Sequence, residues 1–365
     1  SIINTFEETR FSFPEGELIR NNLNFLKLEL IKLETKNTEP QDYSSLFGNI
    51  KDLINDDNLQ LNRLFQIDTF KDLTNSTLSD ATLKKLRKGM YALNKLYHKP
   101  KNQKLEKFKS EFVNRYGHEM MSLCDVLDPD SGINYINISQ AKTPLLNEIP
   151  LSAKNSNDRK ISYSSRDEFL LKKVIFSYQK NVKSIKLKSE ELDSFKEDIQ
   201  LYPDTFSVLF SLLTDNEEQK IDIKSISGPS ANNLIGRFSY LHEDILNISK
   251  EICELEQINH SDALIAEIVH LPEARTGNIL HRKYQRDYEI PYLAKSSLPL
   301  ENQILITDLY VTVKNDKVKL YSKTYGKEVI PRLGNAHNYS FMALPVYNFL
   351  CDIQNQYSSG FAFNW

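Results

Sequence analysis

Two different spacings of apolar residues divide this sequence, and they constrain the fold more than any other feature. In the first half, apolar side chains recur at helical spacing, most clearly in residues 17–35 and 79–97, where they would form one apolar face. In the second half they alternate or form short runs, as in residues 220–227 and 264–270, which is typical of strands. The pattern predicts an α+β chain: a helical N-terminal part followed by a mixed strand and helix part with antiparallel hairpins.

The remaining expected elements follow the same two spacings. Further helices are expected at residues 43–58, 244–257 and 339–355 and from Ser165, Ser189 and Asp204; further strands at 61–70, 304–313 and 317–324. Ser79 would cap the helix that it precedes. Asn315 and Asp316 separate the last two strands, and such a pair favours the left-handed turn of a tight hairpin. The polar stretch 152–159 predicts a linker, which divides a mainly helical subdomain, residues 1–155, from a mixed subdomain, residues 156–365.

Composition excludes several classes of protein. With 40% hydrophobic residues in 365 positions, the chain can bury a large core. Its longest nearly apolar run, residues 206–213, falls short of the roughly 20 residues that span a bilayer. The formal net charge of -3 argues against a uniformly basic nucleic-acid binder, so any nucleic-acid site would be a local patch. The three cysteines, Cys124, Cys253 and Cys351, are too far apart for a Cys-x-x-Cys motif and fit a reducing compartment. We expect a soluble cytoplasmic protein, with any peripheral position at the membrane supplied by partner proteins.

A strand that ends in a group of cations is the clearest candidate site. The apolar run of residues 265–271 stops at Pro272. The segment that follows carries cationic, imidazole and amide side chains: Arg275, Asn278, His281, Arg282 and Arg286. A loop of this kind presents hydrogen-bond donors to an anionic substrate. The alternative is a solvated loop whose arginines pair with neighbouring carboxylates and only brace the chain.

Two further charged residues are candidates for catalysis. Arg237 follows Gly236 shortly after the turn at residues 227–230, and its guanidinium offers a planar fork to a carboxylate or phosphate. The alternative is an ordinary exposed arginine at the start of a helix. Asp68 is expected in a strand, where it would orient an arginine or accept a proton from an attacking hydroxyl. The alternative is an ordinary aspartate at a strand end.

Motifs for several other chemistries are missing. Residues 326–328 lack the spacing of a phosphate-binding loop. His270 and His281 lack the spacing of a zinc site and have no third ligand nearby, and no Gly-x-Ser-x-Gly turn is present. The segment 125–135 resembles a calcium loop but contains Pro129 and ends without the glutamate ligand. We therefore expect no metal and no resident cofactor.

Five blocks of the sequence resemble the lantibiotic dehydratase family, in its large N-terminal domain. They are LFQID at 64–68, SGPS and LIGRF between 227 and 238, AEIVHLPEARTGNILHRKYQRDYEIPYLA at 266–294, GKEVIPRLGNAHN at 326–338 and LPVYNFLCD at 344–352. The blocks keep the order that they have in the family. The resemblance implies that Arg237 and Asp68 belong to the active region. It also implies a set of substrate-binding or tRNA-binding residues: Arg275, Asn278, His281, Arg282, Arg286, Arg332 and His337.

The resemblance also implies an activity. The parent enzyme would move glutamate from glutamyl-tRNA to Ser and Thr hydroxyls of a ribosomal precursor peptide. It would then eliminate the glutamate to leave dehydroamino acids, in lantibiotic, lanthipeptide or thiopeptide-type biosynthesis. Glutamyl-tRNA is a co-substrate, and no other cofactor is implied, since acyl transfer needs alignment, a base and stabilisation of the oxyanion. The implied partners are the precursor peptide, glutamyl-tRNA, a cyclase and a transporter of the same pathway, and a second copy in a homodimer of the full-length enzyme.

The ends of the sequence suggest a fragment. The chain begins without methionine and stops at the aromatic run of residues 361–365, so we expect a piece of a larger enzyme that is inactive in isolation. Two alternatives share the resemblance. One is a peptide–aminoacyl-tRNA ligase, which adds an amino acid and eliminates nothing. The other is a non-catalytic scaffold that binds peptide or tRNA. A downstream elimination domain in the full gene would separate the dehydratase from the ligase.

Overall fold

The computed structural model of this chain consists of two compact units, Ser1–Asp72 and Leu73–Trp365. Each unit is described here by itself. The structure describes residues 13–35, 39–54, 60, 64–65, 67–71, 76–97, 101–135, 163–196, 202–215, 218–271, 283, 285–339, 343–356 and 360–361. The predicted subdomain boundary after residue 155 lies outside these residues and stays a prediction. The predicted α+β class, with helices in the N-terminal part, is confirmed.

The first unit contains two helices that contact each other, α2 (Pro14–Thr35) and α3 (Pro40–Ile54). Both begin at a proline, whose missing N–H costs nothing in the first turn of a helix. The strand predicted at residues 61–70 is wrong, because residues 64–65 and 67–70 lie in no strand. Its apolar residues are spaced three apart instead of two, and Ile67 and Phe70 are exposed.

A mixed six-stranded sheet forms the centre of the second unit. Its order is β1-β6-β7-β8-β4-β5. The strands are β1 (Met121–Ser122), β4 (Ala263–Val269), β5 (Tyr288–Pro291), β6 (Leu309–Lys314), β7 (Lys317–Ser322) and β8 (Lys327–Arg332). β6, β7 and β8 are antiparallel neighbours, whereas β4 runs parallel to both β8 and β5. The carboxyl ends of the three parallel strands β8, β4 and β5 therefore lie on the same side of the sheet, which we call its carboxyl edge.

The predicted hairpin between β6 and β7 is confirmed. Asn315 and Asp316 both have positive φ, 51° and 58°, as a tight turn of this hand requires. β6 begins at Leu309, later than expected, because the preceding residues form the short 3-10 helix η6 (Ile306–Asp308). A second 3-10 turn, η5 (Leu300–Asn302), precedes it.

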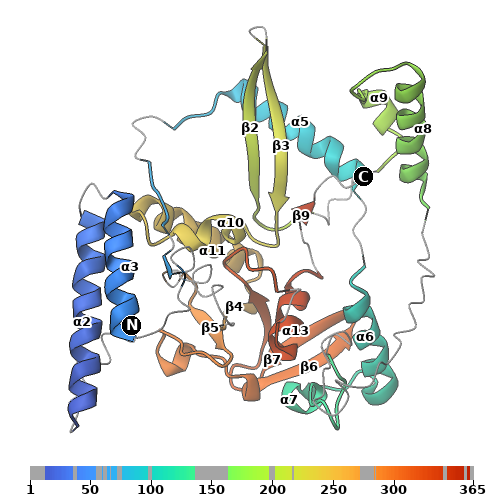
Figure 1. The fold of residues 1–365 in the computed structure, drawn as a ribbon. Helices are drawn as coiled ribbons and strands as arrows, with labels where there is room; N and C mark the ends of the chain where they lie inside the picture. The colour runs from blue at the N-terminus through green and yellow to red at the C-terminus, as the bar shows by residue number, and fades with distance from the viewer. Residues whose placement is uncertain are drawn as a thin grey trace, which may run out of the picture. The chain divides into compact units, whose positions relative to one another are not determined.

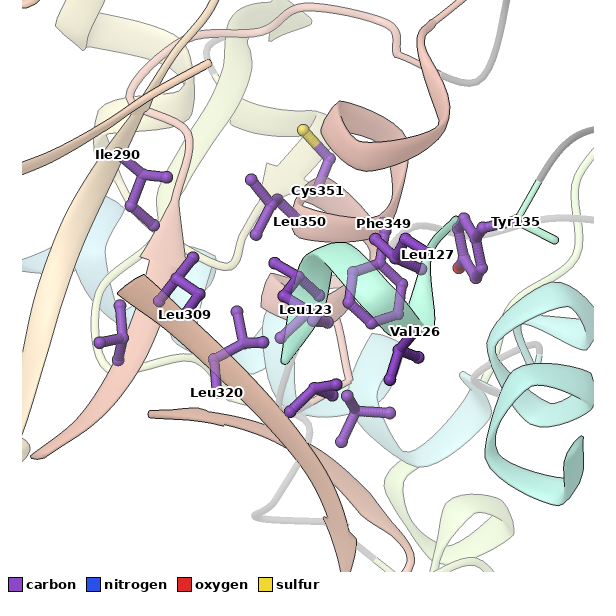
Figure 2. Packing of buried hydrophobic residues seen from close by; sticks show 14 of the residues in the cluster. Leu123, Val126, Leu127, Tyr135, Ile290, Leu309, Leu320, Phe349, Leu350 and Cys351 are labelled. Carbon is purple, nitrogen blue, oxygen red and sulfur yellow. The ribbon is translucent and has the colours of Figure 1, made fainter. Parts of the chain in front are cut away.

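Three helices cover one face of this sheet: α6 (Gln103–Tyr116), α7 (Leu123–Val126) and α13 (Pro345–Gln354). Figure 2 shows Leu123 of α7 and Phe349 of α13 in the same cluster as the sheet residues Leu309 and Leu320. α13 starts at Pro345, not at residue 339 as predicted, because proline is tolerated at the first position of a helix but not inside it. This face holds the main hydrophobic core.

The other face of the sheet is more polar. α11 (Glu243–Asn259) packs on β4 and turns four residues inward at a spacing of three to four: Leu246, Ser249, Cys253 and Glu256. The side chains of β4 and β8 on this face alternate with those of the main core. They include the apolar residues Ile265 and Ile330 and, towards the carboxyl ends, Glu267 and Arg332. Charged residues are thus buried between helix and sheet.

A separate three-stranded sheet has the order β2-β3-β9, with β2 (Ser207–Asp215), β3 (Glu218–Ser227) and β9 (Gly360–Phe361). β2 and β3 form the long antiparallel hairpin seen in Figure 1, which α5 (Asp80–Leu96) contacts. The helix predicted to begin at Asp204 is wrong, because the apolar run that follows pairs with β3 as a strand. Two further helices are α8 (Ser165–Gln179) and α9 (Ser189–Leu192). No helix within the described ranges is both long and apolar enough to cross a membrane.

Candidate active site at the carboxyl edge of the parallel strands

The turn that carries Arg237 rests on the chain just beyond β8. This turn is the 3-10 helix η4 (Gly236–Phe238), which follows the short helix α10 (Asn232–Ile235). Gly236 lies against Gly334 so closely that an added Cβ would overlap the Gly334 carbonyl oxygen. Gln285 Nε2 donates to the Gly236 carbonyl at 3.1 Å. Asn233 Nδ2 donates to the carbonyls on either side of Gly334, at 2.8 and 3.2 Å.

Arg237 is held by its own neighbour as well as by this turn. The side chain is half-buried, and its guanidinium carbon lies 4.6 Å from the centre of the Phe238 ring. Stacking on an aromatic face suits a planar guanidinium, which keeps its charge at any physiological pH. Arg237 is therefore a fixed cation at the carboxyl edge of β8, and not the solvated surface arginine of the alternative interpretation.

A buried ion-pair network lies beneath this turn, between α11 and β4. Arg286 Nη2 lies 2.5 Å from Glu256 Oε2, and its Nε lies 3.3 Å from Glu267 Oε2. The three side chains are 3%, 0% and 5% exposed. Burial alone would lower the pKa of Arg286, but the negative charges of Glu256 and Glu267 outweigh it and the pKa is raised. The Glu267 carboxylate also accepts the Gly334 N–H at 2.5 Å, which links the network to the Arg237 turn.

Arg332 extends the network on the neighbouring strand. It is 2% exposed and is the register partner of Glu267 across β4 and β8. Its Nη2 lies 3.8 Å from Asp204 Oδ2, which lies 2.8 Å from His260 Nε2. The bond from His260, together with the nearby cations, lowers the pKa of Asp204 in spite of its partial burial. Sequence reasoning missed Glu256, Glu267 and Asp204, although an acidic residue in the apolar strand β4 was a usable signal.

Two histidines flank one tyrosine at the same edge. His270 follows β4 directly, and His337 lies in the loop after β8. The Tyr347 ring of α13 lies between them, with its centre 4.5 Å from the ring of His270 and 5.7 Å from that of His337. Burial lowers the pKa of both imidazoles, and the proximity of His270 lowers that of His337 further. His270 is not among the predicted site residues. Its position directly after a buried strand is the sequence signal that could have identified it.

The sequence matches a family model over nearly its whole length. Residues 10–365 match the model described as lantibiotic dehydratase, N terminus. The chain belongs to the lantibiotic dehydratase N-terminal family. The predicted resemblance is thereby confirmed. Among curated proteins, none matches the sequence.

One solved structure shows that this fold is shared with another protein, and two more are similar to parts of it at lower scores. The tRNA-dependent lantibiotic dehydratase MibB from Microbispora sp. 107891 is 14% identical, with a TM-score of 0.73 over 96% of this chain and 34% of that chain. Two structures of the TbtB glutamylation domain from thiomuracin biosynthesis are 15% identical. The first has a TM-score of 0.46 and covers 90% of this chain and 42% of that chain. The second, bound to 5'-phosphodesmethylglutamycin, has a TM-score of 0.49 and covers 98% and 44%. The chain spans about a third of MibB, at 34% of its length.

The structure brings together part of the predicted dehydratase site. Four predicted residues lie around the carboxyl ends of β4 and β8: Arg237, Arg286, Arg332 and His337. Asp68 belongs to the first unit, where it is half-buried outside any helix or strand. The others lie outside the described residues: Arg275, Asn278, His281 and Arg282. In the described parts of the chain, no group of three or more His, Cys, Asp or Glu side chains is placed to hold a metal ion.

The buried position of Arg286 differs from the phosphate contact that the sequence predicts. Its guanidinium bridges two carboxylates inside the protein, so its charge is already matched there. Arg332 is similarly enclosed. The physical reason is that Glu256 and Glu267 face the same side of the sheet as these arginines, and neither acid is close to them in sequence. In this domain the two arginines are buried beside the Gly334 segment, against which the Arg237 turn packs.

Proposed function

We propose that this chain is the glutamyl-transferring part of a tRNA-dependent peptide dehydratase. The observation that carries the proposal is the fixed position of Arg237. A chain of this family places a permanent cation on a turn that is fastened to the carboxyl edge of parallel strands. Ligands of sheets that contain parallel strands commonly bind outside this edge. The fold shared with MibB, whose name records tRNA dependence, supports the assignment.

The proposed reaction is an acyl transfer. The substrates are glutamyl-tRNA and a ribosomally made precursor peptide, and a Ser or Thr hydroxyl of the peptide attacks the glutamyl ester. Arg237 would bind the glutamate side chain or stabilise the oxyanion, as a fixed cation does best in a site shielded from water. Elimination of glutamate would follow at a second site, because it needs removal of the α-proton and not acyl transfer.

An exchange of one arginine tests this proposal. In the complete enzyme that contains this sequence, Arg237→Ala should slow glutamyl transfer by about two to three orders of magnitude, as the loss of one oxyanion donor does elsewhere. Arg87→Ala is the matched control, since Arg87 is an exposed arginine on α5. The peptide is weighed after incubation with glutamyl-tRNA. Transfer by the Arg237 variant within threefold of the wild-type rate would contradict the proposal.

The same assay separates the alternatives. A peptide–aminoacyl-tRNA ligase would leave a stable amide-linked addition, whereas an ester-linked glutamyl group is lost in mild base. A non-catalytic scaffold would leave the peptide mass unchanged. The chain by itself is expected to add no glutamyl group, and a mass gain of one glutamyl group with the isolated chain would contradict that expectation.

A further inference from the structure

His270 and His337 share an arrangement that packing alone does not require. Each is 9% exposed, and each directs Nδ1 inward over 2.8 Å, His270 to the Tyr292 carbonyl and His337 to the Tyr347 hydroxyl. Within the described part of the chain, neither Nε2 atom has a hydrogen-bond partner. Neither Nε2 atom is among the fully buried polar atoms that lack a hydrogen-bond partner. Both Nε2 atoms therefore reach solvent, while the rest of each ring is enclosed.

The carbonyl of Tyr292 fixes the tautomer of His270. A carbonyl can only accept a hydrogen bond, so Nδ1 carries the proton and Nε2 carries a lone pair. Among the described residues, the other titratable groups that face this ring are His337 after β8, Tyr292 after β5 and Tyr347 of α13, which bonds Cys351. None of these groups is a carboxylate, so no anion in the described part of the chain stabilises a charged ring. With its pKa lowered by burial, His270 is uncharged at neutral pH.

His270 lies at the same edge of the sheet as the turn that carries Arg237. His270 directly follows β4, and the neighbouring parallel strand β8 leads into the loop of Gly334, on which the Arg237 turn rests. The same loop continues to His337, which shares Tyr347 with His270. Contacts therefore connect Arg237 to His270 along a single edge of the sheet. In the sequence, Arg275, the first cation of the predicted segment, comes five residues after His270.

We propose that His270 is the general base of glutamyl transfer, an inference that rests on the function proposed above. Nε2 takes the proton from the Ser or Thr hydroxyl as its oxygen bonds to the glutamyl carbonyl carbon. The ester bond to the tRNA ribose then breaks, and the same proton passes to the departing ribose oxygen. His270 ends the cycle unchanged, and no further reactant is needed. Tyr347 is a positioning residue that packs against its ring, and His337 packs against Tyr347.

One substitution removes the base and keeps its inner hydrogen bond. In His270→Asn, the amide nitrogen of asparagine takes the place of Nδ1 and can still donate to Tyr292, whereas Nε2 is lost. His118→Asn is the matched control, because His118 Nδ1 also lies 2.8 Å from a backbone carbonyl, that of Val313, far along the sheet on β6. Both variants are made in the complete enzyme and assayed with glutamyl-tRNA and peptide.

The expected result has two parts. At pH 7, His270→Asn should transfer glutamate about 10²–10⁴-fold more slowly, the usual contribution of a general base. The wild-type rate should rise with pH through an ionisation below the ordinary histidine value of about 6.5, and the variant should lose this rise. His118→Asn should keep both the rate and the pH profile. A His270 variant with an unchanged pH profile overturns the proposal, whatever its rate, because a purely structural role would change only the amount of active enzyme.

A measurement on the wild-type chain covers the case in which His270→Asn fails to fold. Long-range proton–nitrogen spectra of histidine-labelled protein report which ring nitrogen carries the proton, and the chain has 7 histidines to resolve. His270 with protonated Nδ1 and unprotonated Nε2 at pH 7 supports the proposal, and the opposite tautomer or a charged ring overturns it. If the wild-type enzyme adds no glutamyl group, the proposed function itself fails and this inference falls with it.

Discussion

Replacing Arg286 with methionine should destabilise the second unit by about 3–5 kcal/mol, the usual cost of breaking a buried ion pair. Methionine fills most of the space but leaves the Glu256 and Glu267 carboxylates, 0% and 5% exposed, without the guanidinium that they share. Loss of a single hydrogen bond to a charged group would cost only about 1.5–3 kcal/mol. The larger figure applies because two buried charges lose their common partner.

Urea denaturation followed by circular dichroism measures this effect, as a shift of the unfolding midpoint at unchanged slope. Arg87→Met, on the exposed face of α5, is the matched control and should change stability by at most about 0.5 kcal/mol. Adding Glu256→Gln to Arg286→Met should restore part of the loss, because one of the two unmatched charges is then removed. If the free energy of unfolding of Arg286→Met lies within about 1 kcal/mol of that of the control, the network does not hold α11 to the sheet and the reasoning is refuted.

Three further outcomes follow from the structure. Because burial lowers the pKa of His270 and His337, the unfolded chain binds more protons, so the thermal midpoint should fall as pH drops below about 6.5; a flat profile would contradict this. Tyr135→Phe removes a 2.7 Å hydrogen bond to the buried Asp352 carboxylate and should cost about 1.5–3 kcal/mol in urea denaturation; a neutral result would refute it. Asn315→Val puts a β-branched residue at a φ of 51° and should cost about 1–2 kcal/mol by the same assay, unless the turn changes type.

Much of the fold was predictable where the signal is local. Ser79 caps α5 by accepting the Thr82 N–H at 3.2 Å, and the turn at Asn315 sets the β6–β7 hairpin. One error arose where a distant segment decides. Residues 207–215 form a strand because β3 pairs with them along their whole length, although Asp204 resembles a helix start. The predicted strand at 61–70 failed because its apolar residues have the wrong spacing.

The sequence indicated which residue types form the candidate site, but it did not indicate their burial, their ion pairs or their tautomers. Sequence placed Arg286 among exposed cations, and only the fold brings Glu256, thirty positions earlier in the chain, to its guanidinium. Likewise, the tautomer of His270 depends on a carbonyl of β5's neighbour Tyr292, which no spacing rule connects to it. The resemblance identified Arg237, and its fixation by Gly334 could be seen only in three dimensions.

The meeting of Gly236 and Gly334 has a consequence for anyone who redesigns this domain. Two main-chain segments are in contact there with no side chain between them, so no side-chain rearrangement can change the distance between the η4 turn and the Gly334 segment. Substitutions elsewhere in the turn can alter shape or charge, but a side chain at Gly236 would lift the whole turn, and Arg237 with it. Grafting this site onto another scaffold would therefore require both segments together, with their backbone spacing intact, since a transfer of the arginine alone would carry over its charge without its position.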